Sequence, residues 1–160
     1  MVKTDDDLNV LEELQIVLGD TLEWVTLGKV KPEVLKMHVD NGLLLEARAS
    51  SVRSEEAKWK IIKFLTDDYS QSGSFWEPVK KYTLAGSSVH FDKSFVLAKW
   101  PGLASYFDYR IVDVSTLREL GKRWLPAYSL PEWDESEHRA LSDIHRSIEI
   151  LRFWRGELYG

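Results

Sequence analysis

Apolar residues recur along this chain with two different periods, and these periods predict helices and strands. Ala57, Ile61, Phe64 and Leu65 stand at helical spacing after Ser54, a residue type favoured at the N-cap of a helix. We therefore expect a helix that begins near Ser54 and buries this face. Strands are expected where apolar or β-branched residues cluster, at 14–18, 82–85 and 109–114.

Start and stop signals predict further helices. Pro32 can open a short helix, and Ser115 can cap another. The last helix is expected to begin near Asp134, which forms a capping-box pattern with Glu137, and to end near Gly156. The remaining expectations are a helix at about 91–99, a turn at 40–42, and loops at 67–74 and 125–133. Strands that alternate with helices indicate one α/β layered domain over residues 1–160.

Composition narrows the class of protein. With 44% hydrophobic and 29% charged residues the chain fits a globular domain, and no apolar run reaches the roughly 18 residues of a membrane span. We therefore expect an intracellular protein with no membrane partner. The absence of cysteine excludes disulfides and thiolate metal sites, and it fits a reducing compartment.

Charge limits the nucleic acids that the chain can bind. The net charge is −5 and no long basic run occurs, whereas proteins that grip long DNA or RNA usually present a basic face. We therefore expect no binding to a long duplex. Two possibilities stay open: the chain binds no nucleic acid, or it binds a very short piece in a local pocket where metal ions supply positive charge.

Two aspartates are expected among apolar positions of helices. Asp143 shares a helical stripe with Ile150 and Trp154, and Asp92 lies about one turn before Phe95 on the expected inner side of its helix. An unpaired carboxylate there is costly, so each needs a cation or hydrogen-bond donors. Oxygen ligands of this kind suit Mg²⁺ or Mn²⁺. The plainer alternatives are a structural Asp143 paired with an arginine and an ordinary helix-start Asp92.

A histidine and a turn add further candidate chemistry. His138 lies five residues before Asp143 and could act as a general base near a metal. The alternative is a surface or capping histidine. Gly86-Ser87-Ser88 is expected in a strand-to-helix turn, where backbone N–H groups and hydroxyls can receive a phosphate.

Three ordered segments resemble the DEDDh 3′→5′ exonuclease family. Residues 138–143 read His-Arg-Ala-Leu-Ser-Asp and are similar to its His-x-Ala-x-x-Asp motif. Residues 86–95 resemble its second motif. Residues 109–120, continued by 122–126, resemble the oligoribonuclease branch specifically, and weaker similarity reaches back to residues 7–11. The likeness therefore covers nearly the whole chain.

The resemblance implies a fold and an activity. The family has a ribonuclease H-like mixed sheet flanked by helices. It removes nucleotides from the 3′ end of very short RNAs, dinucleotides included, with two divalent metals. We therefore expect a 3′→5′ exoribonuclease that degrades short oligoribonucleotides to mononucleotides with Mg²⁺ or Mn²⁺. We expect it in the cytoplasm, or in the mitochondrion if the source is eukaryotic.

The resemblance also assigns reactive residues. Asp92 and Asp143 would be metal ligands, and His138 would be the base that activates water. Tyr109 matches a tyrosine that, in oligoribonucleases, reaches the active site of the partner subunit. The resemblance therefore implies a homodimer.

A second group of matches concerns substrate binding. Ser88, Arg110 and Ser115 match the group that caps the 5′ phosphate of a dinucleotide, and a longer chain would collide with such a cap. Arg110 suits this role because a guanidinium can grip phosphate through two bonds. His38 matches a histidine that packs against a base, and a surface helix residue is the alternative at this position.

The chain departs from the family's pattern at its start. The family's first motif, Asp-x-Glu on the opening strand, occurs nowhere in the sequence, and the likeness begins inside the family's second strand. We therefore expect an N-terminally short domain without the first strand and without two of the four metal-binding carboxylates. The run Asp5-Asp6-Asp7 is no replacement, because an acidic run near a terminus is usually solvated. A truncated enzyme, a degenerate paralogue and a core completed by a partner chain are all open explanations.

Three functions therefore compete. The first is the active exoribonuclease. The second is a catalytically impaired oligoribonuclease-like protein that binds short nucleotides or pairs with a partner. The third is an α/β interaction domain that binds neither metal nor nucleotide. Cleavage of a dinucleotide separates the first from the others, and nucleotide binding separates the second from the third.

Overall fold

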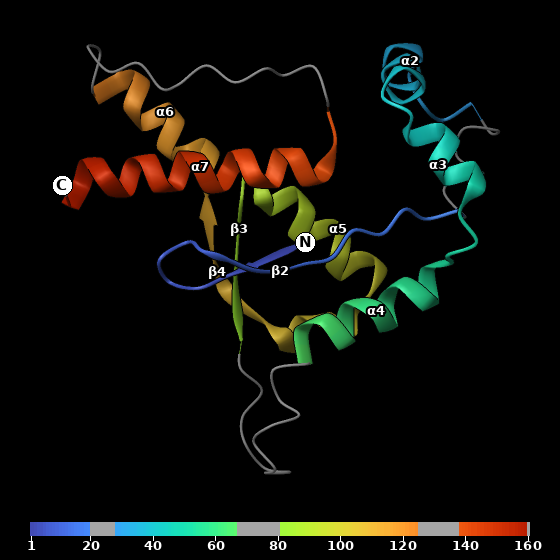
Figure 1. Ribbon diagram of the computed structural model, residues 1–160, viewed down its shortest axis with the longest axis horizontal. Coiled ribbons are helices and arrows are strands. Elements are labelled where there is room, and N and C mark those ends of the chain that lie inside the picture. The colour runs from blue at the N-terminus through green and yellow to red at the C-terminus, as the bar shows by residue number, and fades with distance from the viewer. Residues whose placement is uncertain (20–27, 67–80, 125–137, 160) are drawn as a thin grey trace, which may run out of the picture.

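The computed structural model describes residues 1–19, 28–66, 81–124 and 138–159 (Figure 1). Helices and strands are mixed along the chain, which confirms the expected α/β class and agrees with a ribonuclease H-like fold. The elements in chain order are β1 (Val2–Thr4), β2 (Val10–Glu13), α2 (Pro32–Asp40), α3 (Leu43–Ala49), α4 (Ser54–Thr66), β3 (Tyr82–Gly86), α5 (Val89–Lys99), the 3-10 helix η2 (Pro101–Tyr106), β4 (Phe107–Asp113), α6 (Val114–Trp124) and α7 (Ala140–Tyr159).

Two two-stranded sheets occur in these residues. β1 and β2 form an antiparallel hairpin in which Val2 pairs with Glu13. β3 and β4 are parallel, and Gly86 at the end of β3 pairs with Asp113 at the end of β4. Because parallel strands point the same way, the starts of α5 and α6, which follow these two strands, meet at one edge of the sheet.

Helix α7 lies across this edge. It contacts β3 and α6, and Figure 1 shows it running past the ends of β3 and β4 from which α5 and α6 begin. Helix α5 also contacts both strands, and η2 returns the chain from α5 to β4. The strand ends, two helix starts and the face of α7 therefore lie together.

Across the described residues, none of the helices combines the length and apolar character needed to cross a bilayer.

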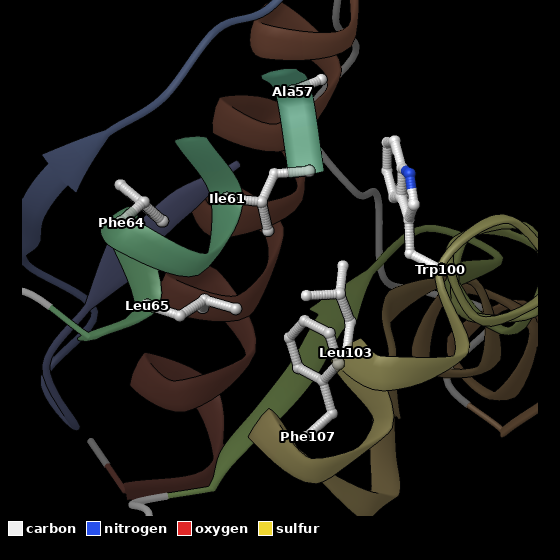
Figure 2. Packing of buried hydrophobic residues seen from close by; sticks show 7 residues of the cluster. All are labelled: Ala57, Ile61, Phe64, Leu65, Trp100, Leu103 and Phe107. Atoms are coloured by element: carbon white, nitrogen blue, oxygen red, sulfur yellow. The ribbon is translucent and has the colours of Figure 1, made fainter. Parts of the chain in front are cut away.

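The main core lies between α4 and the segment that links α5 to β4 (Figure 2). Leu103 of η2 is completely buried there. The helix face predicted from the sequence is confirmed, because all of its members are buried. The cluster consists of Ala57, Ile61, Phe64, Leu65, Trp100, Leu103 and Phe107. Each large side chain buried in this way contributes about 1.5–3 kcal/mol.

A second buried cluster joins α6 to α7. Val114 and Ile150 are completely buried and pack with Trp154. Gly121 of α6 faces this tryptophan so closely that a Cβ atom on it would lie 2.8 Å from Trp154 Cζ2. The absence of a side chain at Gly121 therefore sets how closely the two helices approach.

Polar contacts tie the N-terminal hairpin to α7. His145 Nε2 lies 2.8 Å from Glu13 Oε1, and Arg155 pairs with Asp7 at the hairpin turn. Arg152 Nη2 also donates to the backbone oxygen of Leu8 in the hairpin turn, at 2.7 Å. Exposed pairs of this kind contribute little individually, about 0–1 kcal/mol each. Together they align the hairpin along the exposed side of α7.

Helices α2 and α3 contact one another and are held to the beginning of α7. Arg139 Nη2 lies 2.6 Å from Glu46 Oε2 of α3. Asn41, in the turn between α2 and α3, donates from Nδ2 to the backbone oxygen of His138 at 3.1 Å. The expected short helix from Pro32 and the turn at 40–42 are both confirmed.

The structure corrects several expected elements. Residues 14–18 form no strand. Leu14 exchanges backbone hydrogen bonds with Met1, and the alternation of Leu14, Ile16 and Leu18 reflects side chains that pack against the main core. The last helix begins at Ala140 and continues through Gly156 to Tyr159. The expected start near Asp134 is therefore wrong, because residues 138 and 139 are not helical. The capping box at 134 and 137 and the loops at 67–74 and 125–133 lie outside the described residues. Among the described elements, β1, β2, α3 and the 3-10 helix η2 were not predicted.

Two helical glycines provide a matched test of the α6–α7 contact. Gly156→Ala places a methyl group in open space and should stabilise the protein by about 0.5–1 kcal/mol, because alanine favours helix. Gly121→Ala gains the same propensity but forces Trp154 to move, so it should be about 1–3 kcal/mol less stable than Gly156→Ala. Urea unfolding of both variants measures the difference. Equal stabilities would contradict the close α6–α7 packing.

Candidate functional site

The clearest polar cluster lies where β3 and β4 end. Ser88 precedes α5, and Ser115 lies in the first turn of α6. Their hydroxyl oxygens are 3.2 Å apart. Asp113 Oδ1 accepts hydrogen bonds from the backbone N–H of Ser88 at 2.9 Å and of Ser115 at 3.0 Å. The N-termini of two helices and two hydroxyls therefore meet around one carboxylate. Helix N-termini are common binding places for anions.

Asp113 is held in its charged form. Burial would raise the pKa of this carboxyl, but hydrogen bonds from His90 and from the backbone N–H of Ser88 and Ser115 outweigh it and lower the pKa. His90 Nδ1 lies 3.2 Å from Asp113 Oδ2. The stabilisation from these bonds is present at neutral pH and is lost as the pH falls through the lowered pKa.

A second serine pair connects this cluster to α7. The hydroxyls of Ser87 and Ser147 are 3.0 Å apart, and Ser147 is 95% buried. Ser147 Oγ also donates to the backbone oxygen of Asp143 at 2.9 Å, so Ser87 must donate in the first contact. This chain of bonds holds the turn of α7 that carries Asp143 beside the turn between β3 and α5.

The two aspartates are more exposed than the sequence indicates. The side chain of Asp143 is 48% exposed, and Oδ1 lies 3.6 Å from Arg146 Nη1, which is the arginine pairing left open from the sequence. Asp92 is exposed, and its expected inner position on the helix is wrong. The buried face of α5 is instead carried by Val89, which is buried, and Val96, which packs against the main core.

His138 precedes α7 and does not belong to it. Its backbone has φ 42°, a left-handed conformation that few non-glycine residues adopt, and its side chain is exposed. The backbone oxygen accepts the bond from Asn41 described above. His138 is therefore positioned by the α2–α3 turn, and not by a helix of its own.

The other residues assigned by resemblance lie further apart. Tyr109 is 76% exposed on β4. The guanidinium carbon of Arg110 lies 4.3 Å from the centre of the Tyr109 ring, and Nη1 lies 3.7 Å from Asp108 Oδ1. The contacts of Arg110 are thus with its own strand and not with the two serines. His38 lies on α2, where Nδ1 is buried without a hydrogen-bond partner in the described structure.

The described carboxylates do not complete a two-metal site. Within residues 1–19, 28–66, 81–124 and 138–159, no group of three or more His, Cys, Asp or Glu side chains is arranged to hold a metal ion. Asp143 already faces an arginine cation, and Asp92 points into solvent. Divalent cations need several oxygen ligands in one place, and the described side chains do not supply them.

Sequence reasoning missed Asp113 and His90. Asp113 ends a β-branched run and precedes a helix, so its position carries the signal of a helix N-cap. Ser115 was expected to be that cap, but it lies inside the first turn and donates its N–H to Asp113. The link from Asp113 to Ser88, 25 residues away, has no signal in local sequence.

Comparison with known proteins agrees with the resemblance. Residues 27–151 match the family described as Exonuclease. The chain is 35% identical to an oligoribonuclease of Neisseria meningitidis serogroup B, over 97% of this chain and 78% of that protein. It is also 35% identical to an oligoribonuclease of Actinobacillus pleuropneumoniae serotype 5b, over 96% of this chain and 79% of that protein. A Corynebacterium diphtheriae oligoribonuclease is 36% identical over 95% of this chain and 69% of that protein.

The bond between Ser87 and Ser147 can be measured by a double-mutant cycle. Ser87→Ala, Ser147→Ala and the double variant should show a coupling of about 0.5–1.5 kcal/mol, because the hydroxyls meet in a partly buried place. Chemical unfolding gives the four free energies. Ser94 is the control, because its hydroxyl donates to the carbonyl four residues earlier, as that of Ser147 does, but its side chain is exposed. Ser87→Ala paired with Ser94→Ala should therefore show no coupling. Additive effects of the first pair would contradict the contact.

Proposed function

This chain belongs to the exonuclease family and has oligoribonucleases as relatives, and we propose that it is a 3′→5′ exoribonuclease that degrades very short oligoribonucleotides, dinucleotides included, to mononucleotides. The observation that carries the proposal is 35% identity to an oligoribonuclease over 97% of the chain. Similarity of this extent to enzymes of one name favours the exoribonuclease over the non-catalytic and interaction-domain alternatives. One exonuclease domain over residues 1–160 is part of the proposal.

The hydroxyls of Ser88 and Ser115, which form the serine cluster, suit short substrates. We assign the hydroxyls of Ser88 and Ser115 as a cap for the 5′ phosphate of a dinucleotide, supported by their separation of 3.2 Å beside two helix starts. Arg110 would join the cap by turning away from Tyr109, which its exposed side chain allows. His38 would pack against a base. A cap at this point blocks a longer 5′ extension, and the net charge of −5 also disfavours long nucleic acids.

The reactive groups are assigned around the start of α7. His138 would accept a proton from the water that attacks the terminal phosphodiester, and Asp92 and Asp143 would be metal ligands. The chain of serine bonds supports this grouping, because it joins the turn bearing Asp143 to the turn that precedes α5.

Exonucleases of this family generally use divalent metals. Mg²⁺ or Mn²⁺ is the proposed cofactor, since carboxylate oxygens suit both, although the described residues leave the ligand set incomplete.

A homodimer is part of the proposal. Tyr109 is 76% exposed on β4, so its ring is available to a second subunit. In a two-fold dimer each subunit would send Tyr109 toward the site of the other.

The cytoplasm is the proposed location, supported by the absence of cysteine, which suits a reducing compartment.

Cleavage of a 5′-labelled dinucleotide tests the function. The wild-type chain should release labelled mononucleotide when Mg²⁺ or Mn²⁺ is present and should stop when EDTA removes the metal. His138→Ala should lower kcat/KM by about 10²–10⁴, the usual contribution of a general base. His145→Ala is the matched control, because this histidine of α7 pairs with Glu13 of the hairpin. No cleavage by the wild-type chain at saturating metal rejects the proposal.

Mixing two impaired variants tests the shared site. Tyr109→Ala and His138→Ala homodimers should each be impaired. In a mixed dimer, one site combines the native His138 of one subunit with the native Tyr109 of the other. A one-to-one mixture that exchanges subunits should therefore recover about a quarter of the wild-type sites. Activity no higher than the mean of the two variants would exclude a tyrosine supplied by the partner.

A further inference from the structure

Asp113 connects two segments that are separate in the sequence, residues 88–90 and 113–115. Its Oδ1 atom accepts from the backbone N–H of Ser88 and of Ser115, and its Oδ2 atom faces His90 Nδ1 at 3.2 Å. The bond to Ser115 is local, whereas those to Ser88 and His90 cross from β4 to the beginning of α5. One side chain thus determines how the two serine-bearing turns sit relative to each other.

The carboxylate is well suited to this connection. Its side chain is only 15% exposed, so water competes little for its oxygens. The three donors keep the pKa of Asp113 below its ordinary value against the effect of burial. Hydrogen bonds to a charged acceptor are the stronger kind, and two of them end on the same oxygen atom.

The backbone at Ser88 needs such an anchor. Ser88 has φ 53° and ψ 35°, the left-handed conformation that costs free energy for any residue with a side chain. This conformation is held by the bond from its N–H to Asp113. The same arrangement brings the Ser88 hydroxyl to 3.2 Å from the hydroxyl of Ser115.

We propose that Asp113 is the positioning residue of the 5′-phosphate cap: its carboxylate fixes the turns of Ser88 and Ser115 so that both hydroxyls face one terminal phosphate. This inference rests on the proposed function, which places the phosphate at these serines. Asp113 itself does not touch the substrate. It acts through the two backbone N–H groups that it holds, and so determines preference for a phosphorylated 5′ end.

Positioning and simple charge predict opposite results. A carboxylate near a phosphate repels it, so removing the negative charge alone would strengthen binding of a 5′-phosphorylated dinucleotide. Removing the anchor of the two turns weakens that binding. Asp113→Asn keeps the shape of the side chain, but its neutral amide oxygen holds the two N–H groups more weakly than the carboxylate does, so the direction of its effect separates the two explanations.

The experiment compares the affinities of two dinucleotides that differ only in a 5′ phosphate or a 5′ hydroxyl. The wild-type chain should prefer the phosphorylated form by about tenfold or more. Asp113→Asn should reduce this ratio to about one to three, with an affinity for the hydroxyl form within about twofold of wild type, because only the cap is altered. Calorimetry in Ca²⁺, chosen to slow turnover, gives both dissociation constants.

Asp5→Asn is the matched control. Asp5 Oδ1 also accepts two backbone N–H bonds, from Asp7 at 2.9 Å and from Asn9 at 2.8 Å, but it lies in the hairpin turn. This variant should keep the wild-type ratio. In ¹H–¹⁵N spectra, Asp113→Asn should shift the amide resonances of Ser88 and Ser115 upfield, and Asp5→Asn should leave both in place.

Each outcome supports or overturns the inference. An Asp113→Asn ratio that is unchanged or higher overturns it and leaves the proposed cap intact. An equal loss of affinity for both dinucleotides shows a merely structural role and also overturns it. A wild-type chain without preference for the 5′ phosphate refutes the cap, and the inference falls with it.

A second variant covers failure of Asp113→Asn to fold. His90→Ala removes the partner of Oδ2 at a side chain that is 54% exposed, so the fold should tolerate it. The carboxylate is then less firmly oriented, and the preference for the 5′ phosphate should fall by at least about twofold. An unchanged preference, together with unchanged Ser88 and Ser115 amide resonances, overturns the inference.

Discussion

The hydrogen bonds of the Asp113 carboxylate hold the ends of two parallel strands to the helices that follow them. Because Gly86 and Asp113 are paired across β3 and β4, the side chain of Asp113 reaches the turn before α5 as well as the first turn of α6. The positive ends of both helices therefore point toward one place. The serine cluster, and every function proposed for it, depends on this junction.

Apolar packing keeps the junction in position from behind. Val114 follows Asp113 directly and is completely buried against Ile150 and Trp154 of α7. Gly121 allows Trp154 to approach α6 closely. The partly buried contact between Ser147 and Ser87 then fixes the position of α7 along its axis. The core and the site thus share their supports, since the same helix closes the hydrophobic cluster and carries Asp143.

The carboxylates of the candidate site are less well supported than its serines. Asp143 is half exposed beside Arg146, and Asp92 lies on the solvent side of α5. Sequence spacing predicted both as inner positions. Helical periodicity gives the angle of a side chain about its own helix, but it does not say which side of that helix another element covers. For α5 the buried side is that of Val89 and Val96, and Asp92 lies on the exposed side.

The sequence by itself determined which residues form the helix at Ser54 and its buried face, the strand at 82–86 and the family to which the chain belongs. These are local patterns or ordered motifs, and both can be read along one dimension. Only the tertiary structure decided that Asp113 would bind Ser88, that residues 14–18 would pack against the core without forming a strand, and that Arg110 would lie on Tyr109. Each of these depends on which surfaces meet in space, and hydrophobic period and residue type leave that choice open.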